Sequence, residues 1–311
     1  MAPGAQSCEV MKILLIGANG QLGRDLMAAL AQHDVLGTVR GAITADDSET
    51  DRLSPVALDV CDAVEVRATI AGFLPNIVIN CAAYHRVDDI ESDASQALAV
   101  NALAAQRLAL ACRELDAALL HVSTDYVFDG AKRAPYVETD LPNPLSAYGT
   151  SKLAGELLIR AAWRKHYIVR TCGLYGLAGA SGKGGNFVNT MLRLAQEGQP
   201  IRVVNDQTCT PTFTKDLAQQ IARLIETEAY GVYHITNAGA CTWYEFACEI
   251  FRLAGLQPDV RPITSAEFNA PARRPPYSVL ENAALKALGI DQMRHWREAL
   301  AEYISLKVAQ R

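Results

Sequence analysis

Residues 11–23 read Met11-Lys-Ile-Leu-Leu-Ile-Gly17-Ala-Asn-Gly20-Gln-Leu-Gly23, a short apolar run followed by three spaced glycines. The run predicts a buried strand, and the apolar spacing that follows predicts a helix. Gly17 permits a tight turn, Gly20 lets the backbone approach a ligand, and Gly23 lets the helix pack close to the strand. This context predicts a pyrophosphate at the helix N-terminus, as in dinucleotide-binding units. The alternative is a glycine-rich turn without a ligand.

Short apolar runs alternate with helical patterns through the first half of the chain. We expect strands at Lys12–Gly17, Val35–Arg40, Val56–Val60, Asn76–Cys81, Ala117–Ser123 and Tyr167–Thr171, and helices at Leu22–Gln32, about Asp62–Gly72, Ala94–Leu115 and Ser146–Ala162. Continuous apolar strands are typical of parallel sheets that are covered on both faces. The pattern therefore predicts an α/β fold with a doubly wound parallel (Rossmann) sheet, whose loops after the strands share one ligand-binding edge.

The regular alternation ends near Tyr175, which predicts a second, smaller α+β domain built from more than one segment. A helix at Lys215–Glu228 and a strand at Val232–Asn237 are expected to return to the first sheet. We expect residues 11–175 plus about 212–238 to form the dinucleotide-binding domain. The remainder, about 176–211 plus 239–311, is expected to form the substrate domain. Residues 1–10 are either a flexible N-terminal extension or the product of a start codon placed too early.

Composition excludes several classes of protein. Half of the 311 residues are hydrophobic, a fifth are charged, and the net charge of −5 comes without a Lys/Arg cluster, which argues against nucleic-acid binding. The eight cysteines form no C-x-x-C pair and no His pair has zinc spacing, so we expect no metal site. Scattered free cysteines favour a reducing compartment. With neither a signal peptide nor a membrane-length apolar run in the sequence, we expect a cytoplasmic protein without membrane contact.

The strand ends nearest the glycine turn suggest how a dinucleotide would lie. The turn residues expected to contact it are Gly17, Asn19, Gly20, Gln21, Leu22 and Gly23. At the second strand end Arg40 stands where an acidic residue would favour NAD, and an arginine there favours the 2′-phosphate of NADP. A solvated surface arginine is the alternative, so NAD stays open. Asp59-Val60 would lie beside the adenine, and Ala82-Ala83-Tyr84 would line the ribose and nicotinamide side.

The candidate catalytic residues lie further along, in Tyr148-Gly-Thr-Ser-Lys152 at the start of a predicted helix. Their i, i+4 spacing places Tyr148 and Lys152 on one helical face. A free tyrosine has a pKa of about 10, and a nearby ammonium lowers that pKa, so the phenol can donate a proton to a ketone. The pair follows Ser123-Thr124-Asp125 on the ligand edge of the fifth strand, where the Thr124 hydroxyl can orient the same oxygen. The alternative for Thr124 is a cap or turn residue.

Together these motifs resemble the dTDP-4-dehydrorhamnose reductases, within the extended short-chain dehydrogenase/reductase superfamily. The matching stretches run almost end to end: Gly-Ala-Asn-Gly-Gln-Leu-Gly (17–23), Asn-Cys-Ala-Ala-Tyr (80–84), Ser-Thr-Asp-Tyr-Val-Phe-Asp-Gly (123–130), Tyr-Gly-Thr-Ser-Lys-Leu-Ala-Gly-Glu (148–156), Asn-Phe-Val (186–188) and Tyr-His-Ile-Thr-Asn (233–237). The tyrosine–lysine pair is shared by the whole superfamily, whereas the Ser-Thr-Asp-Tyr-Val-Phe run is specific to this reductase group.

The resemblance implies an NAD(P)H-dependent oxidoreductase that reduces the C4 ketone of a nucleotide-linked 6-deoxyhexose, yielding dTDP-L-rhamnose. It implies that Thr124, Tyr148 and Lys152 are catalytic, that Lys152 also holds the nicotinamide ribose, and that Thr124 and Asp125 touch the sugar. Asn101 would support a proton relay behind Lys152, the alternative being a helix-packing amide.

The nucleotide of the substrate is expected in the second domain. Asn186 and Phe187 follow a glycine there, and Arg202 suits a pyrophosphate. Some members of the family bind magnesium at a subunit contact, so a homodimer is compatible with the resemblance. Matching magnesium ligands cannot be located in the sequence.

Three departures fall on the substrate side. Members of the family often carry Trp where this chain has Gly173, threonine where it has His85, and Asn before a serine where it has Tyr277. His85 is either a substrate contact or a surface residue. The departures leave two alternatives to rhamnose formation: another nucleotide-deoxysugar 4-ketoreductase, or a non-catalytic regulatory subunit resembling the methionine adenosyltransferase β subunit. The Thr124/Tyr148/Lys152 set argues for chemistry.

Overall fold

The computed structural model describes residues 9–41, 55–178 and 185–309. Within these ranges a seven-stranded, fully parallel sheet has the order β11-β6-β5-β4-β1-β2-β3. Its strands are β1 (Lys12–Ile16), β2 (Asp34–Val39), β3 (Val56–Ala57), β4 (Ile77–Asn80), β5 (Ala118–Thr124), β6 (His166–Thr171) and β11 (Gly231–His234). The doubly wound parallel sheet is therefore confirmed. The αβ unit after residue 211 does return to this sheet, since β11 pairs with β6.

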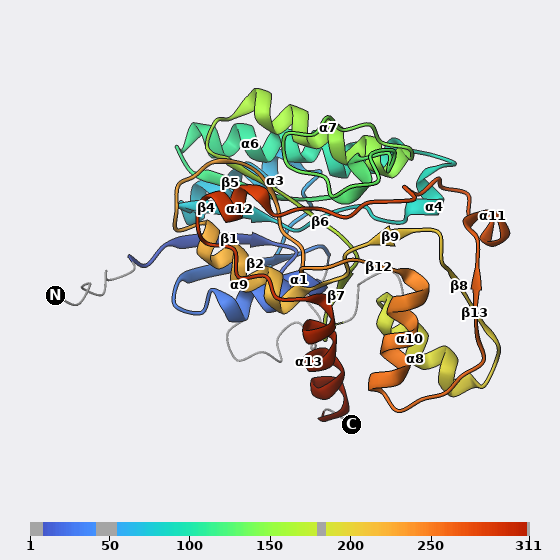
Figure 1. The fold of residues 1–311 in the computed structure, drawn as a ribbon. Helices are drawn as coiled ribbons and strands as arrows, with labels where there is room; N and C mark the ends of the chain where they lie inside the picture. Colours follow the sequence, from blue (N-terminus) through green and yellow to red (C-terminus); the bar gives the residue numbers. More distant parts are fainter. Residues whose placement is uncertain (1–8, 42–54, 179–184, 310–311) are drawn as a thin grey trace.

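Helices cover both faces of the sheet (Figure 1). One face packs against α1 (Gln21–Ala29) and α9 (Thr214–Leu224), and the other against α3 (Ala63–Phe73), α6 (Ala105–Glu114) and α7 (Ala147–Ala162). Each face has its own buried apolar cluster. This double coverage explains why the central strands are mostly apolar.

The helix expected over Ala94–Leu115 is interrupted. After α4 (Val87–Ile90) the chain forms α5 (Ser95–Leu98), a π-helical segment η1 (Ala99–Ala104) and then α6. Asn101 lies in the π-helical segment, and its side chain bonds the backbone of Tyr84 and the hydroxyl of Ser151. Its carbonyl oxygen faces Gly155 of α7, where a Cβ would come within 2.1 Å of it. Asn101 thus contacts both the loop after β4 and helix α7 from this segment.

A third apolar cluster lies beside the sheet. Its main elements are α8 (Phe187–Glu197), α10 (Trp243–Leu253) and α13 (Trp296–Ala309). Short strand pairs border it: β7 (Leu174–Tyr175) with β10 (Thr212–Phe213), β9 (Thr208–Cys209) with β12 (Cys241–Thr242), and β8 (Ile201–Val204) with β13 (Val260–Ile263). Between these segments the chain returns to the sheet, because Leu285 of α12 (Ala283–Ala287) and Met293 pack with α1 and α9.

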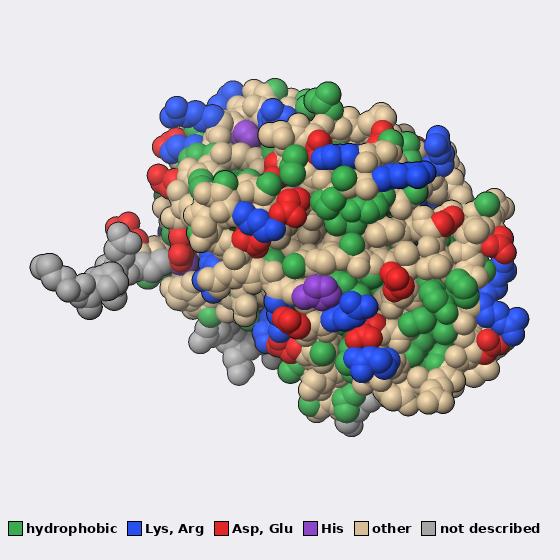
Figure 2. Space-filling view, in the orientation of Figure 1, with side chains coloured by type: hydrophobic (Ala, Val, Ile, Leu, Met, Phe, Trp, Pro, Cys, Tyr) green, Lys and Arg blue, Asp and Glu red, His purple; other side chains and the backbone are tan. Residues whose placement is uncertain are grey.

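The domain boundaries given above stay a prediction. The expected N-terminal extension falls largely on residues 1–8, which lie outside the described residues. In the described part of the chain, no helix is both long and apolar enough to span a membrane. The face of the molecule in Figure 2 carries Lys and Arg side chains interspersed with Asp and Glu, so it presents no extended basic patch.

Candidate active site

A cavity of about 530 Å³ lies where the carboxyl ends of the central strands meet the third cluster. Seventeen of the residues predicted to contact cofactor or substrate line it: Gly17, Asn19, Gly20, Gln21, Leu22, Gly23, Arg40, Asp59, Val60, Ala82, Ala83, Thr124, Asp125, Tyr148, Lys152, Asn186 and Phe187. The topology thus brings loops from distant parts of the chain to one edge of the sheet, as expected for a parallel α/β fold.

The turn between β1 and α1 forms one end of the cavity. Gly17 has a φ of +83°, a conformation that L side chains rarely adopt. A Cβ at Gly23 would lie 2.1 Å from the Gly17 carbonyl oxygen, so a larger residue would push α1 away from β1. Gly20 is the N-cap of α1 and has no side chain to cap the helix. The backbone N–H groups of the first turn of α1 can therefore donate to a ligand, and a helix N-terminus favours an anion.

Asn101 and Tyr84 do not line the cavity. The Asn101 side chain accepts the Tyr84 N–H at 2.9 Å and donates to the Tyr84 carbonyl and to Ser151 Oγ, both at 2.9 Å. It therefore fastens the loop after β4 to α7, behind the cavity wall. Of the two roles considered for Asn101, a proton relay and helix packing, these contacts support helix packing.

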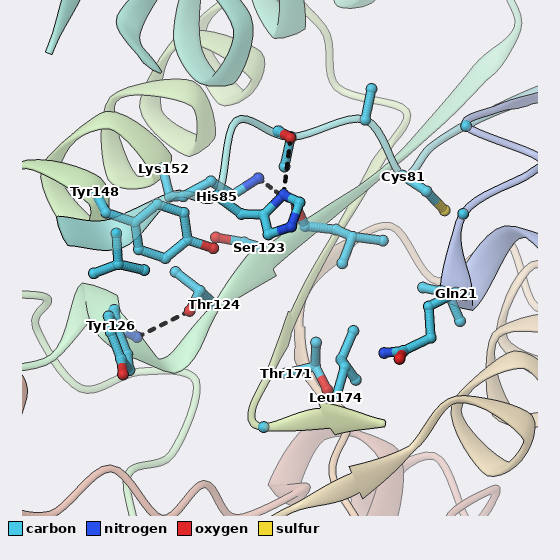
Figure 3. A pocket seen from close by; sticks show the side chains of 18 of the residues that line it. Gln21, Cys81, His85, Ser123, Thr124, Tyr126, Tyr148, Lys152, Thr171 and Leu174 are labelled. Atoms are coloured by element: carbon cyan, nitrogen blue, oxygen red, sulfur yellow. Dashed lines mark hydrogen bonds between the residues drawn. The ribbon is translucent and has the colours of Figure 1, made fainter. Parts of the chain in front are cut away.

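Tyr148 and Lys152 project from α7 toward the end of β5 (Figure 3). Ser146 caps this helix by accepting the Gly149 N–H at 3.1 Å. The Thr124 hydroxyl interacts with the Tyr148 phenol and accepts the Tyr126 N–H at 3.2 Å, so Thr124 is both a cap and a wall of the cavity. Burial raises the pKa of Tyr148 above its usual value of 10, and the hydrogen bond from Thr124 opposes that shift only in part.

Burial and the charge of Asp125 raise the pKa of Tyr148 in this structure, and the expected lowering of that pKa by Lys152 stays a prediction. The ammonium nitrogen of Lys152 donates to the Val122 carbonyl at 2.6 Å and lies 3.1 Å from His121 Nε2. The lysine is 1% exposed, and burial lowers its pKa to about 8. The nitrogen therefore bonds to the backbone of β5.

Polar side chains line the cavity beyond Thr124. Asp125 and Thr171 are buried, and their Oδ2 and Oγ1 atoms have no hydrogen-bond partner among the described residues. Buried polar atoms of this kind are costly unless something bonds them. Both residues line the cavity, so a hydroxyl-bearing ligand there would relieve the cost.

The third cluster supplies the far wall. Phe187 and Trp243 line the cavity with ring centroids 4.8 Å apart, and the N-cap residue Asn186 donates to the Gln21 side chain at 2.9 Å. Arg202 does not line the cavity: it lies on β8 in register with Arg261 of β13, with its side chain exposed. We therefore do not assign Arg202 to this site.

Two of the three departures from the family pattern, Gly173 and His85, line the cavity. A Cβ at Gly173, which has a φ of +55°, would lie 3.2 Å from the indole of Trp243. His85 lines the cavity rather than the outer surface, with Nδ1 3.3 Å from the Ala83 carbonyl oxygen. Tyr277 packs instead in a small apolar cluster with Phe128 and Tyr136.

Several lining residues were not among those predicted to contact cofactor or substrate: Gln207, Thr208, Cys209, Trp243, Pro275 and Ser278. They come from separate segments and meet only in the folded chain. The described ranges contain no group of three or more His, Cys, Asp or Glu side chains arranged to hold a metal ion.

Comparisons with known proteins agree with this geometry. The dTDP-4-dehydrorhamnose reductase of Streptomyces griseus is 42% identical over 296 residues, covering 93% of this chain and 91% of that protein. The dTDP-4-keto-6-deoxy-D-glucose reductase of Streptomyces niveus is 41% identical over 295 residues, covering 94% and 96%. A crystal structure of dTDP-4-dehydrorhamnose reductase from Bacillus anthracis in complex with NADP has 37% identity and a TM-score of 0.85, covering 96% of this chain and 99% of that one.

The family model of the RmlD substrate binding domain matches residues 11–308. These matches extend over nearly the whole chain and confirm the resemblance drawn from the motifs. The chain belongs to the RmlD substrate-binding domain family and is an oxidoreductase of the dTDP-4-dehydrorhamnose reductase type.

Proposed function

We propose that this protein reduces the C4 ketone of dTDP-4-dehydro-L-rhamnose to dTDP-L-rhamnose with NADPH. The proposal rests mainly on one observation: Tyr148, Thr124 and the Gly17–Gly23 turn line the same cavity. A proton donor then lies within the same space as a dinucleotide site. The relatives named as dTDP-sugar reductases support the substrate class.

The residues present fit a nicotinamide dinucleotide. The glycine turn leaves room for a pyrophosphate against the helix amides of α1, since its N-cap residue Gly20 carries no side chain. Arg40 is exposed at the cavity edge and supports a preference for the 2′-phosphate of NADP over NAD. The relative from Bacillus anthracis, crystallised with NADP, supports the same preference.

The nicotinamide, when bound, supplies the hydride that reduces the carbonyl carbon. Tyr148 gives its phenolic proton to the carbonyl oxygen, and its raised pKa keeps that proton in place at neutral pH. Thr124 orients the oxygen by a hydrogen bond. Lys152 positions the cofactor ribose, and the unpartnered atoms of Asp125 and Thr171 take sugar hydroxyls.

Turnover of a panel of nucleotide 4-ketosugars with NADPH and with NADH tests the proposal. We expect the highest kcat/KM with dTDP-4-dehydro-L-rhamnose and NADPH. Tyr148→Phe is expected to lower kcat about 10²–10⁴-fold while NADPH still binds, because only the proton donor is lost. Unchanged turnover in this variant would contradict the mechanism.

A second candidate is reduction of a different nucleotide-deoxysugar. Gly173 favours it, since the cavity wall there has no side chain and Trp243 lies beside the gap. The Streptomyces niveus relative, named for another 4-ketosugar, favours it as well. In the same panel, a preference for a 4-ketosugar other than the rhamnose precursor would select this candidate.

A regulatory role without chemistry is the remaining alternative. It would be supported if no nucleotide 4-ketosugar were reduced with either cofactor and the protein copurified with a synthetase. The Thr124, Tyr148 and Lys152 side chains around one cavity favour chemistry, because a binding subunit does not require them. The cytoplasmic location and the homodimer stay predictions.

A further inference from the structure

The short helix α4 joins the start of the catalytic helix α7 to a segment near the C-terminus. Asp88 of α4 accepts the Ala272 N–H at 3.2 Å through Oδ1 and the Arg274 guanidinium at 2.9 Å through Oδ2. Glu91, the C-cap residue of α4, accepts the N–H of Ala147 at 2.7 Å, and Ala147 is the first residue of α7. The anchor of Arg274 is therefore itself fixed to the helix that carries the proposed proton donor.

The segment that follows Arg274 forms part of the cavity wall. Pro275 and Ser278 line the cavity, and both are buried. Two backbone hydrogen bonds hold this wall against β9: Thr208 donates to the Pro276 carbonyl at 2.9 Å, and Ser278 donates to the Thr208 carbonyl at 2.8 Å. Arg274 thus lies where the wall begins, with its side chain only 19% exposed.

Arg274 has a second partner, because its guanidinium also hydrogen-bonds the phenol of Tyr126. Tyr126 lines the cavity, and its ring meets the ring of Tyr148 edge to face, with centroids 5.8 Å apart and planes at 79° (Figure 3). The Tyr126 backbone packs closely on α7 as well, since a Cβ at Gly149 would lie 2.3 Å from its carbonyl oxygen. One chain of contacts therefore runs from Asp88 through Arg274 and Tyr126 to Tyr148.

A guanidinium suits the centre of this chain. It is planar and donates in several fixed directions, so it can bond a carboxylate and a phenol at once, whereas an ammonium is a single point of charge on a flexible stem. Arg274 does not line the cavity, so it acts through Tyr126. We infer that Arg274, anchored by Asp88, is a positioning residue that holds the Tyr126 ring against Tyr148 and so sets the direction of the Tyr148 phenol. This inference deepens the proposed function and rests on it for the role of Tyr148.

The neighbouring ion pair of α4 provides a matched control. Arg86 and Asp89 lie 3.4 Å apart, and both side chains are more than half exposed. Asp88→Asn keeps the side-chain shape, and the amide oxygen can still accept from Ala272, but an NH₂ group then faces the Arg274 guanidinium. Asp89→Asn makes the same chemical change one residue along, in a pair that touches neither the cavity wall nor α7.

NMR of the whole protein with ring-labelled ¹³C-tyrosine tests the positioning without any substrate. The Tyr148 signals are identified by their loss in Tyr148→Phe, and Tyr126→Leu shows where they lie without the adjacent aromatic ring. We expect Arg274→Lys and Asp88→Asn to move the Tyr148 signals toward those of Tyr126→Leu, and Asp89→Asn to leave them in place. Unmoved Tyr148 signals in both chain variants, or an equal movement in Asp89→Asn, overturn the inference. If Arg274→Lys does not fold, Asp88→Asn alone decides.

Turnover of a 4-ketosugar that the wild-type protein reduces measures the consequence. We expect kcat to fall about 10–100-fold in Arg274→Lys and in Asp88→Asn, because a misplacement of about 1 Å at a reacting group costs up to about that much. The Kd for NADPH should not change, since the Gly17–Gly23 turn is not part of the chain. The double variant should be no slower than the slower single variant, because both substitutions break the same chain.

The outcomes of the two experiments are separable. Additive losses in the double variant, or a kcat in both single variants as high as in Asp89→Asn, overturn the inference. If the wild-type protein reduces no 4-ketosugar, the proposed function fails, whereas the Tyr148 signals still decide whether Arg274 and Asp88 position that ring.

Discussion

The guanidinium of Arg170 on β6 lies 2.6 Å from the carboxylate of Glu156 on α7, and both side chains are at most 3% exposed. Ser123 of β5 donates to the same carboxylate at 2.5 Å, and His234 of β11 lies 3.4 Å from the guanidinium. One buried charge pair therefore joins three neighbouring strands to the helix that carries Tyr148 and Lys152.

Removing one partner of this pair is expected to be costly, because the other charge stays buried without compensation. Glu156→Ala should lower the free energy of unfolding by about 3–5 kcal/mol in urea titrations. Glu197→Ala is the matched control, since the Arg193–Glu197 pair is exposed, and its unfolding midpoint should barely move. Equal losses in the two variants would show that the buried pair has no special role.

Alanine substitutions at two helical glycines are expected to change the stability of the fold in opposite directions. A Cβ at Gly155 of α7 would lie 2.1 Å from the Asn101 carbonyl oxygen, whereas one at Gly72 of α3 would meet nothing within 4 Å. Gly155→Ala should cost about 1–3 kcal/mol by separating the packed helices. Gly72→Ala should stabilise by up to about 1 kcal/mol through helix propensity. Thermal melts measure the midpoint of unfolding for both variants and the unsubstituted protein. If both variants were destabilised equally, the close contact between Gly155 and Asn101 would be contradicted.

Acid should destabilise the fold through His234. Burial, together with the charge of Arg170, lowers the pKa of this histidine to about 3. The unfolded chain therefore binds the proton first, and stability is lost as the pH falls from about 6.5 toward 3, by at most about 1.4 kcal/mol per pH unit for this group.

His234→Gln should flatten that dependence when unfolding free energies are measured at several pH values across the window. A residual slope is expected from His121, whose pKa is lowered in the same direction. A variant as acid-sensitive as the wild-type protein would exclude His234 as a cause.

Arg40 should set the choice of cofactor. Arg40→Gln removes the positive charge at the cavity edge, so the Kd for NADPH is expected to rise about 10–100-fold, as for loss of a charge-assisted hydrogen bond. The Kd for NADH should change little. Fluorescence titration with both cofactors measures the two effects, and a parallel loss of both would mean that Arg40 does not read the 2′-phosphate.

The sheet and its ligand edge could be predicted because they depend on local patterns. Apolar runs gave the strand positions, and the turn at Gly17–Gly23 gave the first crossover. The third strand is shorter than expected, with only Val56–Ala57 paired to β2. The π-helical segment at Asn101 could not be predicted, because its partners Tyr84 and Ser151 are distant in sequence.

The same limit applies to the site. His121 in an apolar strand looks like an ordinary core residue until its register with Asn80 is known. Trp243 looks like a core aromatic at the start of a helix until it is found beside Gly173. Arg202 illustrates the opposite case: its charge suited a pyrophosphate, but the side chain lies on the exposed face of β8.

The route of the chain between the sheet and the third cluster limits how such a protein can change. Tyr175 and Phe213 lie in the cluster, Leu217 and Ile235 on the sheet, Phe246 in the cluster again, Leu285 on the sheet and Trp296 in the cluster. No single cut separates the two halves, so neither can be exchanged as a cassette by one recombination event. A change of substrate specificity then depends on point substitutions in the cavity wall between the sheet and the third cluster. Gly173, beside Trp243, is a position where a single substitution would change the shape of that wall.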